Sequence, residues 1–232
     1  MTYSVLGWAY ETVLCSCTER RFVYRGFLNG PYCPIYGCGA LLDLAILGRI
    51  ENPVLLFLAG AVLTCTLEYF TGLAMEKMFH ARWWDYSDMK FNIQGRVCLL
   101  GAFAFGSLSV LLIKYMQPFL KGLTDAAPPL FLMILGICLA LVFAADLAVT
   151  LSGFVSFNKK LRLLSADIID TKNKMLEIIA DIPKKFNLQE RRMIRAFPKL
   201  SSLNYNEALT TLRERLRAVG KIRKNTKKEN AK

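Results

Sequence analysis

Long apolar runs constrain the fold of this chain more than any other feature. The run from Pro53 to Phe79 contains two acids, Glu68 and Glu76. As a helix it is long enough to cross the roughly 30 Å hydrocarbon core of a bilayer. Further apolar stretches can be read as membrane segments at about 3–17, 32–47, 97–116 and 129–152. We therefore predict an all-α, polytopic helical membrane protein with about five transmembrane helices.

The charge distribution divides the chain into two parts. Residues 157–232 hold 20 Lys and Arg against 8 Asp and Glu, which accounts for the whole net charge of +12. The first 156 residues are neutral and strongly apolar, and 54% of the entire chain is hydrophobic, which is high for a soluble domain. We predict a transmembrane domain at 1–156 and a basic, helical cytoplasmic tail at 157–232.

The tail shows a repeat of apolar residues at intervals of seven: Leu161, Ile168, Met175 and Ile182. This stripe predicts a coiled-coil-like helix over 159–182. It could pack on a neighbouring helix, associate with a second copy or a partner protein, or lie on the anionic inner leaflet. A second helix is expected at about 205–219, followed by a disordered basic end. We expect no nucleic-acid binding, because the aromatic residues of the tail are few and scattered.

Lysine and arginine are concentrated in alternate connections between the predicted spans. The rich connections carry Arg20, Arg21 and Arg25, then Lys77, Arg82, Lys90 and Arg96, and finally the basic tail. The positive-inside rule places these connections in the cytoplasm and the N-terminus outside.

Acids within apolar helices are costly unless they face protein or a water-filled cavity, so they are candidates for a polar site. The acids within or at the edges of the apolar segments are Glu11, Asp43, Glu68, Glu76 and Asp146. Glu68 and Glu76 share a broad helix face about 12 Å apart along the axis. Two interpretations stay open. The acids could lock helix packing by pairing with Arg25 and Arg96, or they could line a functional cavity.

The glycine- and proline-rich segment 30–37 cannot be regular helix throughout, because Pro34 lacks an amide donor and glycine is conformationally permissive. Irregular backbone at membrane depth is tolerated only where protein or trapped water satisfies it. Asn29, just before this segment, and Tyr36, near its end, are included among the candidate site residues.

The aromatic and acidic stretch 80–88 also has two interpretations. Trp83 and Trp84 could anchor the preceding helix at headgroup depth, as paired tryptophans beside charges do. Alternatively, His80, Asp85 and Tyr86 could form a site with the glycine- and proline-rich segment, which the predicted topology places on the same side.

Several chemical functions lack their sequence motifs. The chain contains no phosphate-binding loop, dinucleotide fingerprint, H-E-x-x-H or G-x-S-x-G motif, so it carries no ATPase or hydrolase signature. Its seven cysteines form no C-x-x-C pair, and there is one histidine. We therefore predict no metal site, no cofactor and no enzyme activity from motifs.

Several short blocks resemble the hallmarks of a known family. These are residues 26–37, Asn52-Pro53, Leu67-Glu68-Tyr69, and the segment 82–96 with its Arg-Trp-Trp-Asp-Tyr-Ser, Phe-Asn and Gly-Arg elements. They resemble the bacterial ABC-transporter type IV family (CmpB-like), and residues 195–198 and 205–209 are similar to a stretch its members often carry. The resemblance implies a permease-like subunit of the bacterial cytoplasmic membrane that needs a separate ATPase. It assigns no catalytic or transport residue.

Three functions follow as hypotheses. The first is a transporter membrane subunit of unknown substrate, with Glu68, Glu76, Arg96 and the segment 30–37 along its pathway, completed by an ATPase partner or a homodimer. The second is an integral-membrane enzyme on a lipid or prenyl substrate, using Asp85, His80 and Glu68. The third is a membrane-anchored scaffold or regulator that acts through its tail.

Overall fold

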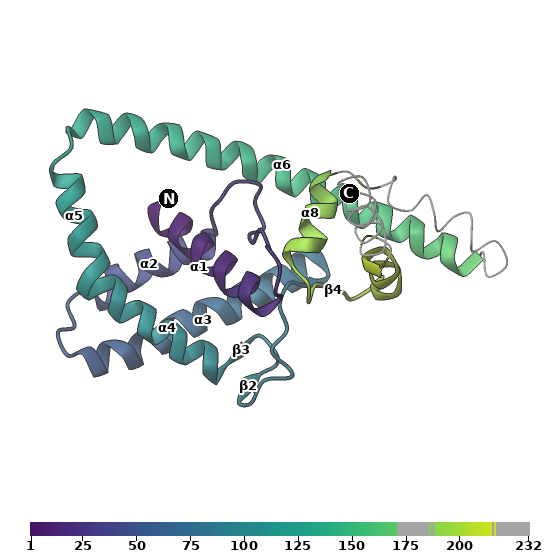
Figure 1. Cartoon of the computed structure of the whole chain (residues 1–232), viewed down its shortest axis with the longest axis horizontal. Helices are drawn as coiled ribbons and strands as arrows, with labels where there is room; N and C mark the ends of the chain where they lie inside the picture. The colour runs from purple at the N-terminus through teal and green to yellow at the C-terminus, as the bar shows by residue number, and fades with distance from the viewer. Residues whose placement is uncertain (171–185, 187, 215, 217–232) are drawn as a thin grey trace, which may run out of the picture.

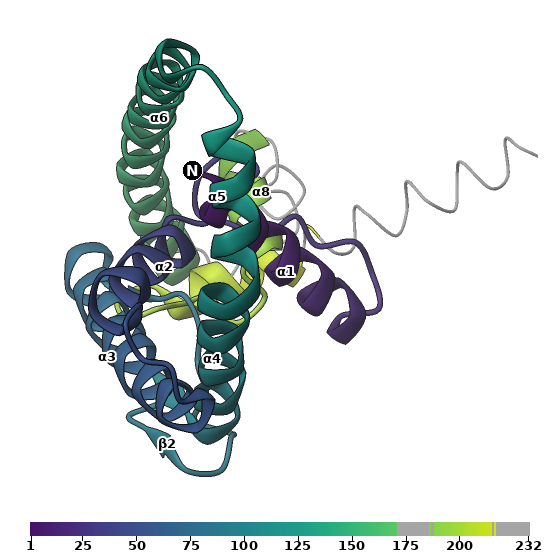
Figure 2. The same ribbon diagram turned by 90° about the vertical axis from the view of Figure 1, so that its left-hand side faces the viewer.

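The computed structural model describes residues 1–170, 186, 188–214 and 216. The fold is helical, with a long helix, α6, running beside a bundle of shorter ones (Figures 1 and 2). In chain order the elements are α1 (Thr2–Thr18), α2 (Pro34–Leu47), α3 (Pro53–Phe79), β1 (Ala81–Arg82), β2 (Asn92–Ile93), β3 (Val97–Cys98), α4 (Leu99–Leu111), the π-helix η1 (Leu112–Met116), α5 (Gln117–Asp125), α6 (Pro129–Asp170), α8 (Leu188–Ala196) and β4 (Ser201–Ser202). Residues 206–214 are also helical.

Three helices of the described chain are long and apolar enough to cross a membrane. They are α3, the continuous run Leu99–Asp125 formed by α4, η1 and α5, and the Pro129–Ser165 part of α6. The expected number of about five spans is not confirmed, because α1 has 17 residues and α2 has 14. The membrane-type helical architecture itself is confirmed.

Helix α3 begins and ends where its sequence predicts. The side chain of Asn52 caps it by accepting hydrogen bonds from two amides of the first turn, at 2.9 and 3.1 Å, and Pro53 follows at the first helical position. His80 closes the other end in the left-handed conformation, and its amide donates to the carbonyl of Glu76.

Helices α3 and α4 approach each other closely because small residues lie at their contact. A Cβ atom on Gly60 would lie 2.4 Å from the Cβ of Ser109, and one on Gly106 would lie 2.7 Å from the carbonyl oxygen of Phe57. Small residues permit such contacts between membrane helices, whose association depends on close packing. The buried Ser109 hydroxyl also donates to Asp43 of α2 at 2.6 Å, which connects a third helix to this pair.

The main hydrophobic core lies at one end of the molecule, where α6, the tail and the segment after α3 meet (Figure 1). Helix α6 runs without a break through residue 157, where the sequence places the domain boundary. From residue 157 onward, this helix buries Phe157, Leu161 and Leu164. Strand β1 pairs with β4 of the tail, with Ala81 opposite Ser202. The membrane domain and the tail therefore share one core.

The predicted tail elements are only partly described. Leu161, the first residue of the heptad stripe, is buried in the shared core. The rest of that stripe from residue 171 onward lies outside the described residues, as does the basic end from residue 217. The second helix is present at residues 206–214, and Leu209 and Leu212 face the core.

Replacing Leu161 by alanine should lower the free energy of unfolding by about 2–5 kcal/mol, because it leaves a cavity where the side chain is 1% exposed. Leu163→Ala is the matched control on the same helix, since Leu163 is 59% exposed, and it should change stability by about 0.5 kcal/mol or less. Thermal unfolding of both variants in one detergent measures the difference. Equal losses would contradict the position of the core.

Candidate functional site

A polar cluster connects α1, α2 and α3 with the segment that follows α3. Glu11 on α1 pairs with Arg25, whose Nε lies 3.0 Å from Oε2, and its Oε1 accepts a hydrogen bond from the Tyr36 hydroxyl at 2.7 Å. On α3, Oε1 of Glu68 accepts from the Tyr86 hydroxyl at 3.2 Å. We call Glu11, Tyr36, Glu68 and Tyr86 the acid–tyrosine cluster.

Glu11 and Glu68, the two acids of the acid–tyrosine cluster, both act on the Tyr86 phenol. Burial raises the pKa of the Tyr86 phenol, and the nearby charges of Glu68 and Glu11 raise it further. The structure thus brings together four candidates that are widely separated in the sequence. Arg25 was expected as an ion-pair partner for the acids of α3, but it pairs with Glu11 instead, because the segment that carries it lies along α1.

Glu68 is the least satisfied acid of this cluster. It is 6% exposed and lies within the apolar helix α3. Its Oε2 has no hydrogen-bond partner within the described chain, and the same part of the structure offers it no ion pair. A buried carboxylate with a free oxygen can accept a proton, a cation or a donor group of a solute without breaking an existing contact.

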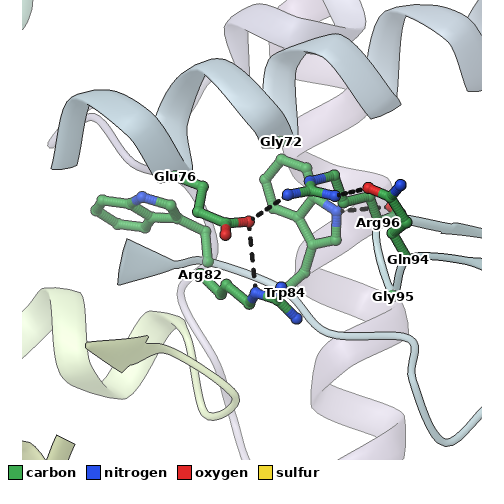
Figure 3. Close-up of a pocket in the computed structure, with 8 residues that line it drawn as sticks. Gly72, Glu76, Arg82, Trp84, Gln94, Gly95 and Arg96 are labelled. Atoms are coloured by element: carbon green, nitrogen blue, oxygen red, sulfur yellow. Dashed lines mark hydrogen bonds and ion pairs between the residues drawn. The ribbon is translucent and has the colours of Figure 1, made fainter. Parts of the chain in front are cut away.

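Glu76 has a different environment, shown in Figure 3. Its Oε2 accepts from Nη2 of Arg96 at 2.8 Å and lies 3.4 Å from Nε of Arg82. Nη1 of Arg96 also donates to Gln94, and the Trp84 indole donates to the Arg96 carbonyl at 3.0 Å. The cavity among them, about 10 Å³, has room for about one water. Glu76 is therefore neutralised, and its contacts fasten the segment 82–96 to α3.

Asn29 belongs to a second polar centre, built around Asp146 on α6. The carboxylate of Asp146 accepts from the amide and side chain of Asn29 at 3.1 and 2.8 Å, from the amide of Gly30 at 2.8 Å and from the hydroxyl of Tyr32 at 2.6 Å. The hydroxyl of Thr150, one turn further along α6, donates to Oδ1 of Asp146 at 3.2 Å, and this is the oxygen that also accepts from Asn29. Asp146 thus holds residues 29–32. Of the segment 30–37, residues 30–33 are irregular as expected, whereas residues 34–37 form the first turn of α2 with Pro34 at its first position.

The tail contacts the connection between α1 and α2, residues 19–33, just before the part that Asp146 holds. Arg192 on α8 donates to the carbonyls of Gly26 and Phe27 at 3.2 and 3.0 Å. In the opposite direction, Nη1 of Arg25 donates to the carbonyl of Ala196 at 2.8 Å. Asp146 and the tail therefore hold two neighbouring parts of one connection, residues 29–32 and residues 25–27.

The two tryptophans occupy unequal positions. Trp83 is 3% exposed, and its ring packs against Phe27, Phe154 and Phe197 with centroid separations of 5.0 to 5.3 Å. Its contacts are therefore with the protein core and not with lipid headgroups. Trp84 is half-buried beside the Glu76 ion pairs, so some of its surface stays accessible.

His80 and Asp85 do not join Glu68. His80 follows the end of α3, about 18 Å from Glu68 along the helix axis. The carboxylate of Asp85 accepts from the hydroxyl and amide of Ser87 at 2.5 and 2.9 Å, and these bonds hold the pKa of Asp85 below its usual range. A single centre with all three groups is not formed.

Sequence reasoning noticed Asp146 as an acid in an apolar run but did not connect it to the segment 30–37. The signal in the sequence was a set of backbone amides without an evident hydrogen-bond acceptor. Free amides at membrane depth require an acceptor, and Asp146 is one of the few acids in such a run that could serve. For Arg192, the tail sequence gives no comparable signal, because many of its basic residues are alike.

Comparison with known proteins gives one match. A family model described as Putative ABC-transporter type IV matches residues 1–151. The matched range contains the acid–tyrosine cluster, Glu76 and Asp146, and it ends before the tail. Searches of curated proteins and of solved structures return no match.

Asp146→Asn should loosen the segment 29–33, because an amide offers one acceptor oxygen where the carboxylate serves several donors. Cys33, which is buried at the end of this segment, should then react several-fold faster with N-ethylmaleimide, as measured by peptide mass spectrometry. Asp85→Asn makes the same chemical change in another loop and should leave the rate at Cys33 unchanged. An unchanged rate in Asp146→Asn would show that other contacts hold the segment.

Proposed function

The chain belongs to the ABC-transporter type IV family, and from this premise we propose that it is the membrane subunit of a transporter whose polar pathway passes the acid–tyrosine cluster. The observation that carries the proposal is the buried Glu68, with one oxygen unpartnered in the described structure. Acids within membrane helices mark ion and solute pathways by default. Tyr36 and Tyr86 supply hydroxyls that can exchange hydrogen bonds with a passing solute.

We propose the following topology. The candidate span α3 runs inward, the run Leu99–Asp125 returns outward, and α6 runs inward again. The basic segment 82–96 and the tail then lie on the cytoplasmic side of a bacterial cytoplasmic membrane, as the positive-inside rule prefers.

The first two helices enter the bilayer in this proposal, although each is shorter than a complete crossing. The amide of Cys33 donates to the carbonyl of Ser4 at 2.8 Å, so α2 begins beside the start of α1 (Figure 1). From there α1 leads toward the tail side and α2 leads away from it toward the start of α3. Interrupted helices that meet within the membrane are a common way to build a transport site. The N-terminus then faces the outer half of the bilayer.

The proposal requires partners. The chain has no phosphate-binding loop, so ATP hydrolysis would come from a separate subunit. We also propose a homodimer through α6, because the most apolar window of this helix has no residue buried within the described chain. A Cβ on Gly136 would likewise meet no atom within 4 Å. Lipid or a second copy would cover this surface.

The other two functions have weaker support. A lipid-modifying enzyme with His80, Asp85 and Glu68 in one centre would need groups that lie about 18 Å apart along α3. A scaffold anchored by an inert membrane domain would need an independent tail, whereas the tail shares its core with Trp83 and α6. Both observations favour one working unit in the membrane.

Copurification tests the proposed function most directly. The full chain, tagged and extracted in mild detergent from its own host, would be analysed by native mass spectrometry. We expect a stoichiometric ATPase subunit. A homo-oligomer without an ATPase would overturn the assignment as a subunit of an ATP-driven transporter.

Glu68→Gln keeps the shape of the side chain and removes its charge, so it should abolish transport. The measurement compares the solutes that cells take from or release into the medium, in a strain lacking the protein and complemented with each variant. Glu51→Gln, at an exposed position between α2 and α3, is the control and should behave like the wild type. Size-exclusion profiles establish equal amounts of folded protein. A fully active Glu68→Gln variant would remove Glu68 from the pathway.

A further inference from the structure

A second cavity lies at the end of the molecule where α6 meets the tail, away from the acid–tyrosine cluster. Its volume is about 290 Å³. Three segments far apart in the sequence form it: the residue after α3, one turn of α6, and the turn that follows β4. Its lining includes His80, Lys159, Arg162, Ser202, Asn204 and Tyr205.

The lining of this cavity is basic and rich in donors. Lys159 and Arg162 are three residues apart and therefore lie on the same side of α6. No Asp or Glu is among the described residues that line the cavity, and neither cation forms an ion pair within the described chain. Lys160, between them, is different, because its Nζ lies 2.9 Å from Glu190. The charges of Lys159 and Arg162 therefore have no ion-pair partner in the described chain, whereas the charge of Lys160 is neutralised by Glu190.

Backbone contacts hold the walls of the cavity together. The amide of Leu203 donates to the carbonyl of His80 at 2.9 Å, which joins the turn after β4 to the end of α3. The side chain of Asn158 donates to the carbonyl of Phe79 at 3.3 Å, which joins α6 to the same end. These bonds join the three segments, and Lys159 and Arg162 line the same cavity as His80.

The position along the helices indicates what the cavity meets. His80 directly follows the candidate span α3, and Lys159 and Arg162 lie in the last two turns of the candidate span Pro129–Ser165. In the topology proposed above, both positions lie at the cytoplasmic ends of these spans, on the side of the inner-leaflet headgroups. Basic pockets between membrane helices on the cytoplasmic side recognise anionic headgroups.

We propose that this cavity binds a phosphate group through Lys159, Arg162 and His80, with hydroxyl and amide groups of the turn after β4 as further donors. The phosphate could be carried by an anionic phospholipid or by a soluble phosphate compound, since both present the same oxygens. The volume is near the lower limit of ligand sites, about 300 Å³, which suits a headgroup or a small phosphate ester. This assignment does not depend on the proposed transport activity.

The test compares three forms of the full chain in detergent: the wild type, the double variant Lys159→Gln/Arg162→Gln, and a control, Lys90→Gln/Arg195→Gln. The control removes one lysine and one arginine from exposed positions outside the cavity, so both variants have the same net charge. Native mass spectrometry measures the binding of phosphatidylglycerol and of phosphatidylcholine. Thermal unfolding with added inorganic phosphate, against added chloride at equal ionic strength, measures the soluble ligand.

We expect the wild type and the control to bind phosphatidylglycerol more tightly than phosphatidylcholine, and the double variant to lose this preference by about tenfold or more. That result assigns the site to a lipid headgroup. If lipid preference is absent but phosphate raises the unfolding temperature of the wild type and the control alone, the ligand is soluble. Equal behaviour of the double variant and the control in both measurements would overturn the site. Size-exclusion chromatography confirms that all three forms are folded.

Discussion

The arrangement of this protein depends on one carboxylate within an apolar helix. Asp146 accepts hydrogen bonds from two backbone amides, an amide side chain and a phenol, all from a segment that cannot form a regular helix. Without water at that depth, those donors need a protein acceptor. The position of the segment decides where α2 begins, and with it the place of Tyr36. Arg25, the partner of Glu11, lies earlier in the same connection between α1 and α2. The positions of Tyr36 and Arg25 in and beside the acid–tyrosine cluster therefore depend on the hydrogen bonds of Asp146, which is not a member of it.

The two glutamates of α3 show how environment separates acids of one helix. Glu76 is paired with two arginines and serves to attach the segment 82–96. Glu68, two turns deeper, has a phenol on one oxygen and no partner for the other in the described structure. Burying an ion pair with good geometry is tolerable, whereas burying a partly satisfied carboxylate is costly. A costly group in a membrane helix is a reasonable place to look for function.

The sequence predicts local features of this chain well. The bounds of α3 follow from Asn52, Pro53 and the end of the apolar run, and the pairing of Glu76 with Arg96 was one of two stated interpretations. Three of the predicted spans correspond to helices of membrane-crossing length. Features that depend on contacts between distant segments were not accessible. The clearest cases are the acceptor role of Asp146 and the burial of Trp83. Its neighbour Trp84 has the same local sequence but is only half-buried.

The number of spans is the part of the prediction that is not confirmed, because α1 and α2 lie where apolar segments were expected but are too short for complete crossings. Apolar composition reports that a segment avoids water, but it does not report whether the segment crosses the bilayer or stops inside a protein bundle. In the structure the amide of Cys33 donates to the carbonyl of Ser4, which joins the starts of the two helices, and the connection between them is irregular. Both are consequences of tertiary packing, which a periodic pattern does not record.

The uninterrupted course of α6 has a mechanical consequence. The helix has 42 residues and carries Asp146 in its middle and Phe157 and Leu161 nearer its end. No break separates these positions, so rotation or sliding of α6 displaces the irregular segment and the tail core together. The tail in turn contacts the same α1–α2 connection at Gly26 and Phe27 through Arg192. These contacts form a closed ring of α6, the connection and the tail, so a displacement of the tail would be passed to the polar centre of Asp146 along two routes.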